Sequence, residues 1–361
     1  MTVSSGTTFD LREPEGAFRL IEGWLREQGF FVPGGEELVA DLFLGYGLSQ
    51  AIRRGSSPPL PEPCPALPLA ACTVRGRRDP VAQSHEAFST GVWKQTWSAA
   101  EYAGAVERVR EAIARGDVYQ VNLVQHLSAP FSGNPRALAP ALAPLKPLHG
   151  EPVVGEGWAV ASASPELFLA RRGPRVWTMP IKGTRPAGEA AELRESEKDA
   201  AEHVMIVDLE RNDLSRVCVA GTVRWPELMA TRELAGVEHM VSTVEGTLRG
   251  DVGLAEILEA TFPGGSVTGA PKIAAVDLIA DLEPVGRGAS MGALGRVYGN
   301  GDLDLALTIR TFAVADGRIH LWVGGGVVWD SDPDAEVAES WLKARPLLEA
   351  IGSPLSEMIS A

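Results

Sequence analysis

Residues 303–323 read LDLALTIRTFAVADGRIHLWV, and this stretch indicates the fold class more clearly than any other. Apolar residues alternate from Leu303 to Ala315, which is the period-two pattern of a β-strand. Asp316-Gly317 is typical of a two-residue hairpin turn, and Ile319 to Val323 returns as the antiparallel partner. Helical patterns lie between such runs elsewhere in the chain. We therefore expect an α+β protein rather than a doubly wound parallel sheet.

Working outward from this hairpin, apolar periodicity predicts further elements as far as residue 350. Strands are expected at 118–127, 157–163 and 166–171, and helices at 98–116, 190–207, 254–260, 271–281 and from Pro333 onward. Residues 1–95 are patterned differently, with one helical stretch at 15–27 and a proline-rich passage at 57–68 that favours a loop or polyproline spacer. We expect a short, partly degenerate N-terminal region at 1–95 and a catalytic domain at 96–361.

The composition is that of a globular protein, and we expect it in the cytoplasm. Of 361 residues, 45% are hydrophobic and 22% are charged, and the formal net charge is −14. No basic run is present, so a nucleic-acid partner is not expected; an anionic ligand would need local cations to reverse the repulsive field. The three cysteines lack metal-binding spacing and indicate reduced thiols. Because no apolar stretch approaches the roughly 20 residues that cross a bilayer, no membrane partner is expected.

Lys182 lies in the segment Met179-Pro180-Ile181-Lys182-Gly183-Thr184-Arg185-Pro186, where proline and glycine are expected to fix the backbone. An amine held against apolar neighbours can lose its proton, because burial disfavours the ammonium form, and it can then act as a nucleophile or base. Taken alone, such a lysine is more often a surface charge. Its neighbours along the chain must decide between the two interpretations.

Two expected helices each carry a pair of acids three residues apart, Asp199 with Glu202 and Glu336 with Glu339. This spacing places each pair on one helix face. If the two faces met, the carboxylates would repel one another unless a cation lay between them, and ligands that are all oxygen suit Mg²⁺. Lys343 shares the second face, so the alternative is a solvated acidic face stabilised by a Glu339–Lys343 pair and the helix dipole.

Two glycine-rich segments are candidate ligand contacts. Residues 262–272 (FPGGSVTGAPK) do not match the spacing of a phosphate loop, but they lead into a helix, and free backbone N–H groups there can hold an anion. Gly324-Gly325-Gly326 ends a strand and permits close approach of the backbone to a ligand. Arg310 is expected to face away from the apolar side of its strand. The alternatives are ordinary turn geometry for the glycines and a surface charge for Arg310.

Glu166 and His239 complete the set of candidate residues. Glu166 starts an apolar strand, where burial could raise the pKa of its carboxyl group and make it a general acid; the alternative is an exposed charge at a strand end. His239 is one of only six histidines. A lone histidine is more often a structural residue than a ligand.

Taken together, these segments resemble the chorismate-utilising enzyme family from about Trp97 to Ala350. The matching segments, in order along the chain, are 116–123 (GDVYQVNL), 164–166 (SPE), 179–186, 202–214 (EHVMIVDLERNDL), 237–243, 262–272, the strand ending at 310–312, and 324–343. The resemblance implies two large, mainly antiparallel β-sheets packed as a sandwich with helices outside.

Two positions separate the members of that family. Members that add water to chorismate carry a lysine base where this chain has Gln120, and a glutamine amide cannot deprotonate water. Anthranilate synthases resemble the chain at Gln120 but have alanine in place of Lys182. The resemblance therefore implies amination of chorismate by a component I of the aminodeoxychorismate synthase type, on the branch to p-aminobenzoate and folate. The alternatives are an anthranilate synthase component I or related enzyme of secondary metabolism that bears a lysine, and a silent scaffold that only activates an amidotransferase.

The resemblance also implies a role for each candidate residue. Lys182 would attack the ring, Glu166 would protonate the departing hydroxyl group and His239 would polarise the ring carboxylate. Glu202 and Glu339 would bind Mg²⁺, supported by Asp199 and Glu336. The expected substrate contacts are Gln120, Thr268, Arg310, Gly326 and Lys343. Ammonia would come from a separate glutamine amidotransferase subunit, because the chain has no convincing glutaminase arrangement of its own.

Overall fold

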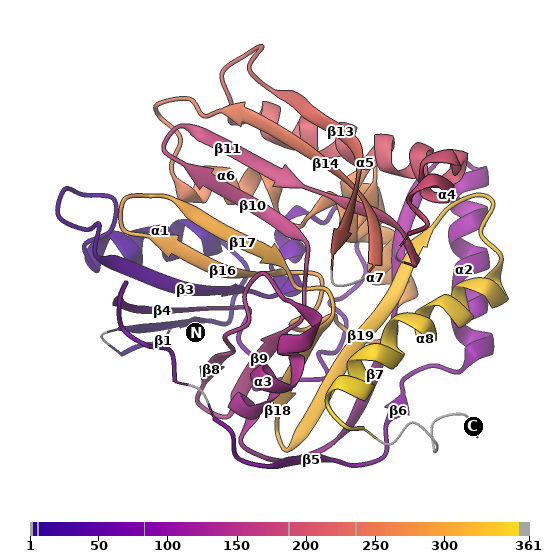
Figure 1. The fold of residues 1–361 in the computed structure, drawn as a ribbon, viewed down its shortest axis with the longest axis horizontal. Coiled ribbons are helices and arrows are strands. Elements are labelled where there is room, and N and C mark those ends of the chain that lie inside the picture. The colour runs from indigo at the N-terminus through magenta and orange to yellow at the C-terminus, as the bar shows by residue number, and fades with distance from the viewer. Residues whose placement is uncertain (1–2, 6, 83, 187, 235–236, 354–361) are drawn as a thin grey trace.

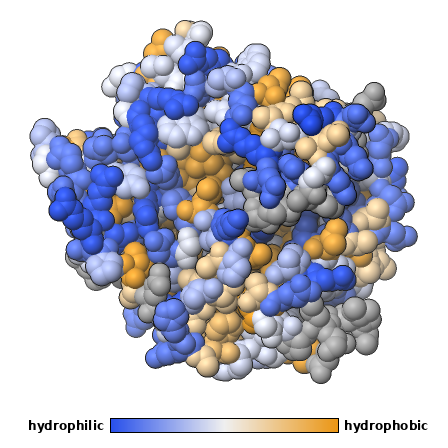
Figure 2. Space-filling view, viewed as in Figure 1, coloured by the Kyte–Doolittle hydropathy of each residue, from blue (hydrophilic) through white to orange (hydrophobic). Residues whose placement is uncertain are grey.

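The computed structural model describes residues 3–5, 7–82, 84–186, 188–234 and 237–353. It consists of two β-sheets whose paired strands run antiparallel, with helices packed around them (Figure 1). The α+β class and the two-sheet architecture expected from the sequence are therefore confirmed. Figure 2 shows one face of the molecule as largely hydrophilic, with hydrophobic side chains gathered in a recess near its centre.

The larger sheet has eleven strands in the described residues, in the order β1-β2-β4-β3-β16-β17-β10-β11-β14-β12, and β13 pairs with β14. Its strands are β1 (Val3–Ser5), β2 (Thr8–Leu11), β3 (Leu38–Leu44), β4 (Ala70–Gly76), β10 (Leu167–Arg172), β11 (Arg175–Met179), β12 (Ile181–Pro186), β13 (Arg224–Leu234), β14 (Val237–Thr247), β16 (Ala293–Tyr298) and β17 (Leu303–Leu307).

The smaller sheet follows the order β15-β7-β19-β18-β9-β8, and β5 and β6 also pair with β7. Its strands are β5 (Phe88–Thr90), β6 (Lys94–Gln95), β7 (Gln120–Gly133), β8 (Val153–Gly155), β9 (Trp158–Ser162), β15 (Gly269–Ala270), β18 (Thr311–Ala315) and β19 (Arg318–Val327). The long β7–β19 ladder brings the start of β7 beside the glycine-rich end of β19, with Asn122 opposite Gly326.

The helices lie mainly outside the sheets. They are α1 (Ala17–Glu27), α2 (Ala99–Ala114), α3 (Leu138–Leu142), α4 (Ala190–Glu195), α5 (Glu197–Ser215), α6 (Leu254–Thr261), α7 (Lys272–Leu282) and α8 (Pro333–Ala350), with short 3₁₀ turns η1 (Tyr46–Ile52), η2 (Pro135–Ala137), η3 (Ala143–Leu145) and η4 (Gly265–Val267). In Figure 1, α2 and α8 flank β7 and β19, and α5 and α6 lie behind the larger sheet.

Helix starts follow the sequence closely. Ser98 caps α2 by accepting the Glu101 N–H, and Asp332 caps α8 by accepting the Ala335 N–H at 2.9 Å. The single helix expected at 190–207 was wrong, because it is divided into α4 and α5. Ser196 lies at the break, where its hydroxyl accepts the Asp199 N–H at 3.2 Å and starts a second helix.

The strand expected at 303–315 was also wrong, because it is two strands in different sheets. β17 ends at Leu307 in the larger sheet, and β18 begins at Thr311 in the smaller one. Arg310 lies in the link between them with a left-handed backbone (φ +51°). Both strands are deeply buried, so apolar residues continue across the break and conceal it. The hairpin at Asp316-Gly317 is confirmed by the pairing of β18 with β19.

The core between the sheets is one continuous apolar cluster. It joins side chains of the larger sheet, such as Leu44 and Leu305, to side chains of the smaller sheet, such as Val121 and Val327. A second cluster packs the outer side of the smaller sheet against α3 and α8, with Phe312 and Leu347 among its members. The two clusters fix β7 and β19 between two packed layers.

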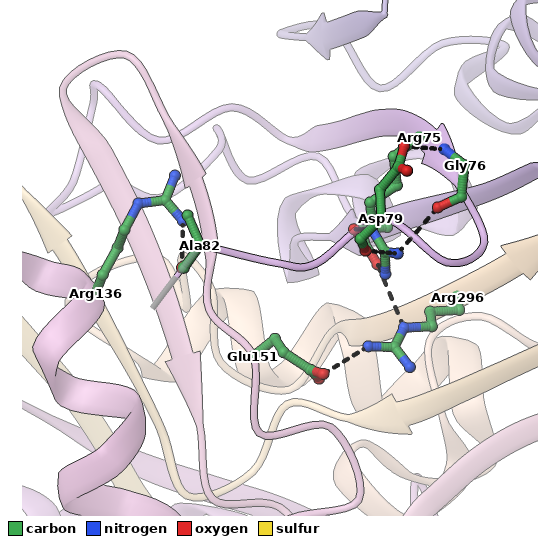
Figure 3. Close-up of polar contacts among 8 residues, drawn as sticks. Arg75, Gly76, Asp79, Ala82, Arg136, Glu151 and Arg296 are labelled. Carbon is green, nitrogen blue, oxygen red and sulfur yellow. Dashed lines mark hydrogen bonds and ion pairs between the residues drawn. The ribbon is translucent and has the colours of Figure 1, made fainter. Parts of the chain in front are cut away.

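Each of the two sheets contains strands from before and from after residue 95. β3 pairs with β16, and β5 and β6 pair with β7. Polar contacts add to these ladders: Arg296 donates to Asp41 at 3.4 Å. Figure 3 shows Arg136 donating to the Ala82 carbonyl, at 3.1 Å, and Arg296 pairing with Glu151, at 2.8 Å, beyond residue 95. The boundary at 95 stays a prediction. Across it, backbone ladders and ion pairs join the two parts of the chain.

A buried ion pair holds the backbone behind the candidate site. Arg287 and Glu283 are 1% and 2% exposed and bond at 2.8 and 2.9 Å. The Arg287 guanidinium also donates to the carbonyls of Asn122 and Val267, and Glu283 accepts the Val124 N–H. The pair therefore ties α7 to β7 and to the turn at 265–267.

Replacing Glu283 by alanine should lower the free energy of unfolding by about 3–5 kcal/mol, because the Arg287 charge would remain buried without its partner. Glu107→Ala removes one member of a half-exposed pair with Arg110 and should cost less than about 1 kcal/mol. Urea denaturation of both variants measures the difference. Equal losses of stability in the two variants would contradict the structural role of the buried pair.

Candidate active site

Lys182 is a buried amine, not a surface charge. It lies on β12, whose pairing with β14 shifts between Lys182 and Thr184. Gly183, at the shift, has φ +66°, and a side chain there would clash with Leu193. The Lys182 side chain is 12% exposed, and its Nζ lies 2.8 Å from Glu202 Oε1. The irregular strand thus turns the amine toward α5.

Glu202 joins Lys182 to Gln120. Its Oε1 accepts a hydrogen bond from Gln120 Nε2 at 2.6 Å as well as the bond from Lys182. Gln120 starts β7, Lys182 lies on β12 and Glu202 on α5, so three distant segments meet at one carboxylate oxygen. The structure therefore brings together the two positions that discriminate between family members in the sequence.

The pKa of Lys182 differs from the expectation of a depressed value. Burial lowers the pKa of this amine, but the Glu202 carboxylate, with Glu166 and Glu210 nearby, outweighs burial and raises it above its ordinary value. The charge of Lys182 in turn holds the pKa of Glu202 below its usual range, against the effect of burial. The pairing with Glu202 thus favours the charged form of Lys182.

The glycines of β19 make room for acids from two helices. A side chain at Gly326 would clash with the Gln120 amide and would lie 2.8 Å from Glu202 Oε1. A side chain at Gly325 would lie 3.3 Å from Glu336 Oε2 and 3.4 Å from Glu339 Oε1. The absence of side chains at these two positions lets α5 and α8 present their carboxylates to the same end of β19.

On α8, the acids have distinct partners. Glu336 Oε1 accepts a 2.7 Å hydrogen bond from Ser331. Lys343 Nζ lies 2.7 Å from Glu339 and donates to the Gly324 carbonyl at 2.9 Å. This half-exposed Glu339–Lys343 pair is the one named in the alternative interpretation of the acidic helix face, and it lies beside the glycine strand. Asp199 approaches the site from α5, with its Cγ 3.4 Å from where a Gly183 side chain would begin.

The donor set suits Mg²⁺, although within the described residues no group of three or more acidic, histidine or cysteine side chains forms a metal-binding cluster. Glu202 and Glu339 offer carboxylate oxygens at neighbouring positions of β19, and each is now neutralised by a lysine. Proteins commonly bind Mg²⁺ through one or two carboxylates, with water and substrate completing the octahedron. Glu202 and Glu339 are ligands of that type, and each lies beside one of two successive glycines of β19.

Glu166 is a buried acid, as the sequence predicts. It is 4% exposed and lies just before β10, and its Oε1 is 3.4 Å from the Ile181 N–H. Burial raises the pKa of its carboxyl group, while the charge of Lys182, a bond from Ser266 and the charge of Arg310 partly offset that rise. A carboxyl group that keeps its proton beside a lysine can donate it to a leaving group.

Arg310 and His239 lie on the Glu166 side of the site. Arg310 lies in the link between β17 and β18. Burial lowers the pKa of its guanidinium, and the nearby charge of Glu166 partly offsets that effect. His239 on β14 is 2% exposed, and burial and the charge of Arg310 lower its pKa, which favours the neutral ring. Its Nδ1 lies 3.4 Å from the Gly183 carbonyl.

Thr268 is the expected contact that the structure supports least. Its hydroxyl donates to the Gly264 carbonyl at 2.9 Å, and its N–H donates to the Gly265 carbonyl at 3.2 Å. The segment 265–267 is a 3₁₀ turn. The free N–H group expected from the loop is therefore already bonded at this residue, and contact between Thr268 and a substrate stays a prediction.

Sequence reasoning missed Glu210 and His203 on α5. Burial raises the pKa of Glu210 to about 8, and its carboxyl group accepts a bond from Thr178 at 3.0 Å. His203 is fully buried and bonds Ser242 at 2.6 Å. Glu210 follows Glu202 by eight residues, so helical spacing could have placed both on one side of the helix.

A family model described as chorismate binding enzyme matches residues 59–349. The chain belongs to the chorismate-binding enzyme family. Among its relatives, the anthranilate synthase component 1 of Streptomyces coelicolor is 40% identical over 84% of this chain and 59% of its own length. That of Thermus thermophilus is 44% identical (69% of this chain, 56% of the relative).

Aminodeoxychorismate synthase relatives match about as well. Component 1 of that enzyme from Escherichia coli is 38% identical over 73% of this chain and 60% of its own length. This chain thus spans less than two thirds of the length of these relatives. Relatives named anthranilate synthase and relatives named aminodeoxychorismate synthase are both similar to this chain, so overall sequence identity does not separate the two activities.

Solved structures show the same fold. Anthranilate synthase component I from Streptococcus pneumoniae superposes with a TM-score of 0.81 at 24% identity, over 96% of this chain and 91% of that one. The menaquinone-specific isochorismate synthase from Escherichia coli gives 0.73 at 17% identity, over 97% and 85%. In the part of the chain that the structure describes, no helix is both long and apolar enough to span a membrane.

Proposed function

We propose that this chain is component I of an aminodeoxychorismate synthase, which converts chorismate and ammonia to 4-amino-4-deoxychorismate. The observation that carries the proposal is the position of Lys182. It is a buried amine that donates to Glu202, and the charges of Glu202 and Glu166 raise its pKa. An anthranilate-type enzyme, which by the family pattern carries alanine here, would leave this position without a nucleophile.

Gln120 supports amination over hydration. Its amide donates to Glu202, so it is a hydrogen-bond donor in the site and cannot act as the base that activates water. The runner-up is an anthranilate synthase component I, favoured by the similarity of the Thermus and Streptomyces relatives. Lys182 distinguishes the two, because only a covalent route uses it.

The cations and the acids suit a substrate with two carboxylates. Lys343 and Arg310 provide positive charge at two sides of the site, and Gln120 can contact the ring from the start of β7. Glu202 and Glu339 would hold Mg²⁺, which when bound would neutralise the ring carboxylate, with Asp199 and Glu336 as supporting acids. His239, which is buried, would donate to the same carboxylate.

In the covalent step, Glu166 supplies the proton that the departing hydroxyl group needs, and it regains a proton when ammonia has added. The lone pair of the neutral Lys182 amine forms a bond to C2, the two ring double bonds shift, and the C4–O bond breaks. Glu166 gives its proton to the departing hydroxyl group, which leaves as water. Ammonia then forms the C4–N bond, the double bonds shift back and the C2–N bond to Lys182 breaks. The proton released from nitrogen restores Glu166.

The partner that Glu202 binds would determine whether Lys182 can act as a nucleophile. While Glu202 pairs with Lys182, the amine stays charged and cannot attack. If Glu202 held Mg²⁺ instead, Lys182 would lose the partner that raises its pKa, while the burial that lowers this pKa would remain. Ammonia would come from a glutamine amidotransferase subunit, as the component 1 names of the relatives suggest.

Trapping the adduct tests this function. The protein is incubated with chorismate and Mg²⁺ but no ammonia, and its intact mass is measured. The expected gain is the mass of chorismate less one water, located by peptide mapping on Lys182. EDTA should abolish the gain. An unmodified wild-type protein that nevertheless consumes chorismate when ammonium is added would contradict the covalent route.

A further inference from the structure

His203 and Ser242 form a buried hydrogen-bonded pair beside the candidate active site. His203 follows Glu202 on α5, Ser242 lies on β14, and both residues are 0% exposed. His203 Nε2 lies 2.6 Å from Ser242 Oγ. No step of the proposed reaction uses either residue. The bond joins the helix that carries Glu202 to the sheet that carries Lys182.

The backbone of Ser242 is bonded to the segment that carries Lys182. Its N–H donates to the Pro180 carbonyl at 3.3 Å, two residues before Lys182. Met240, two residues before Ser242 on β14, pairs with Lys182 itself. Ser242 therefore joins the elements at both ends of the Lys182–Glu202 contact, which measures 2.8 Å.

Met229 on β13 fixes the direction of the bond between Ser242 and His203. Its N–H donates to Ser242 Oγ at 2.8 Å. Met229 has a left-handed backbone (φ +53°), which residues with a Cβ rarely adopt, at a point where the pairing of β13 with β14 shifts. Because Ser242 Oγ accepts this N–H, its own proton is left to be donated to His203 Nε2.

The pair leaves one polar atom of the histidine unsatisfied. Since Nε2 accepts the Ser242 proton, the ring proton of His203 lies on Nδ1. In the described ranges of the chain, this Nδ1 is buried and has no hydrogen-bond partner. A buried donor without a partner lowers the stability of the folded state. The pair is therefore poorly suited to stabilising the fold alone, and the adjacent residue, Glu202, indicates its role.

We propose that His203 and Ser242 are positioning residues that hold Glu202 against Lys182. The hydrogen bonds from α5 to Ser242 and from Ser242 to Pro180 limit how far α5 can move from Lys182. The side chain of Glu202 would then exchange the lysine for Mg²⁺ while its main chain stays in place. The effect of the pair on catalysis rests on the function proposed above, whereas the Lys182–Glu202 contact can be measured without substrate or metal.

Two amide substitutions at residue 203 test the role of the bond. His203→Gln places an amide oxygen near the position of Nε2 and should keep the bond to Ser242, whereas His203→Asn is too short to reach it. In crystal structures without Mg²⁺, the Lys182–Glu202 contact should stay near 2.8 Å in wild type and in His203→Gln. It should lengthen beyond hydrogen-bond distance in His203→Asn.

The kinetic effect should follow the length of this contact. With ammonium as the nitrogen source, His203→Asn should lower kcat by about ten- to a hundredfold and raise the Mg²⁺ concentration needed for half-maximal rate. At saturating Mg²⁺ the dissociation constant of chorismate should change little, because Arg310 and Lys343 are unchanged. His203→Gln should restore most of the wild-type kcat.

Thr96→Val provides the matched control. Thr96 Oγ1 lies 2.6 Å from Nδ1 of His126, a buried histidine of the smaller sheet that is not a candidate site residue. Removing this bond should lower the midpoint of urea denaturation and leave kcat unchanged.

Ser242→Ala keeps the proposal testable if His203→Asn does not fold, because it removes the same bond from the other side. Retention of the Lys182–Glu202 contact in a folded variant that lacks the bond would overturn the proposal, as would a wild-type kcat. A wild-type protein that forms no Lys182 adduct would contradict the proposed function, but the crystal structures would still decide the positioning role.

Discussion

Lys182→Ala is expected to lower the rate of chorismate amination by at least about a thousandfold, because it removes the nucleophile of the covalent route. Mg²⁺-dependent chorismate binding should remain, since Glu202, Glu339, Arg310 and Lys343 are unchanged. Product formation in steady state and calorimetric titration with chorismate measure the two effects. The covalent adduct should disappear as well.

Lys94→Ala provides the matched control, because Lys94 is an exposed lysine on β6. It should react at the wild-type rate. Circular dichroism must show that the Lys182 variant is folded at the assay temperature. A folded Lys182→Ala protein that retains activity within about tenfold of wild type would mean that the lysine has another role.

Glu166→Gln is expected to lower kcat by about 10²–10⁴-fold with little change in KM, because the amide cannot protonate the departing hydroxyl group. The exposed Glu156 offers a matched control, and Glu156→Gln should leave kcat unchanged. Steady-state kinetics with ammonium as the nitrogen source measure both variants. A near-normal kcat in the Glu166 variant would assign proton donation elsewhere.

The dependence of kcat on pH should separate the roles of Glu166 and Lys182. Glu166 must be protonated to donate, and burial raises its pKa, so wild-type kcat should fall as pH rises through that raised value. Lys182 must be neutral to attack, so kcat should also fall toward low pH. Glu166→Gln should lose the alkaline fall of the profile and keep the acidic one.

Much of the fold follows from local sequence signals. Helices begin beside Ser98 and Pro333 and Asp316-Gly317 turns the β18–β19 hairpin, as predicted, because capping side chains and turn residues act on their own backbone. Long-range pairing gave no such signal. The N-terminal strands β1 to β4 were not expected; they pair with one another, and only β3 joins them to the rest of the sheet, through β16 more than two hundred residues away.

In the candidate site, too, the sequence predicted some features and not others. Residue type and spacing identified Lys182, Glu166, Glu202 and Glu339, but not the contacts between them. The raised pKa of Lys182 depends on Glu202, which reaches it from another element, so burial alone predicted the wrong direction. Arg310 was placed on a strand because continuous burial concealed the crossover between the sheets.

The identity of the product tests the central claim most directly. The protein is incubated with chorismate, Mg²⁺ and ammonium, and the products are separated and identified by mass and fluorescence. The account predicts 4-amino-4-deoxychorismate, which retains the enolpyruvyl group, with no release of pyruvate. Fluorescent anthranilate with stoichiometric pyruvate as the main product would contradict it.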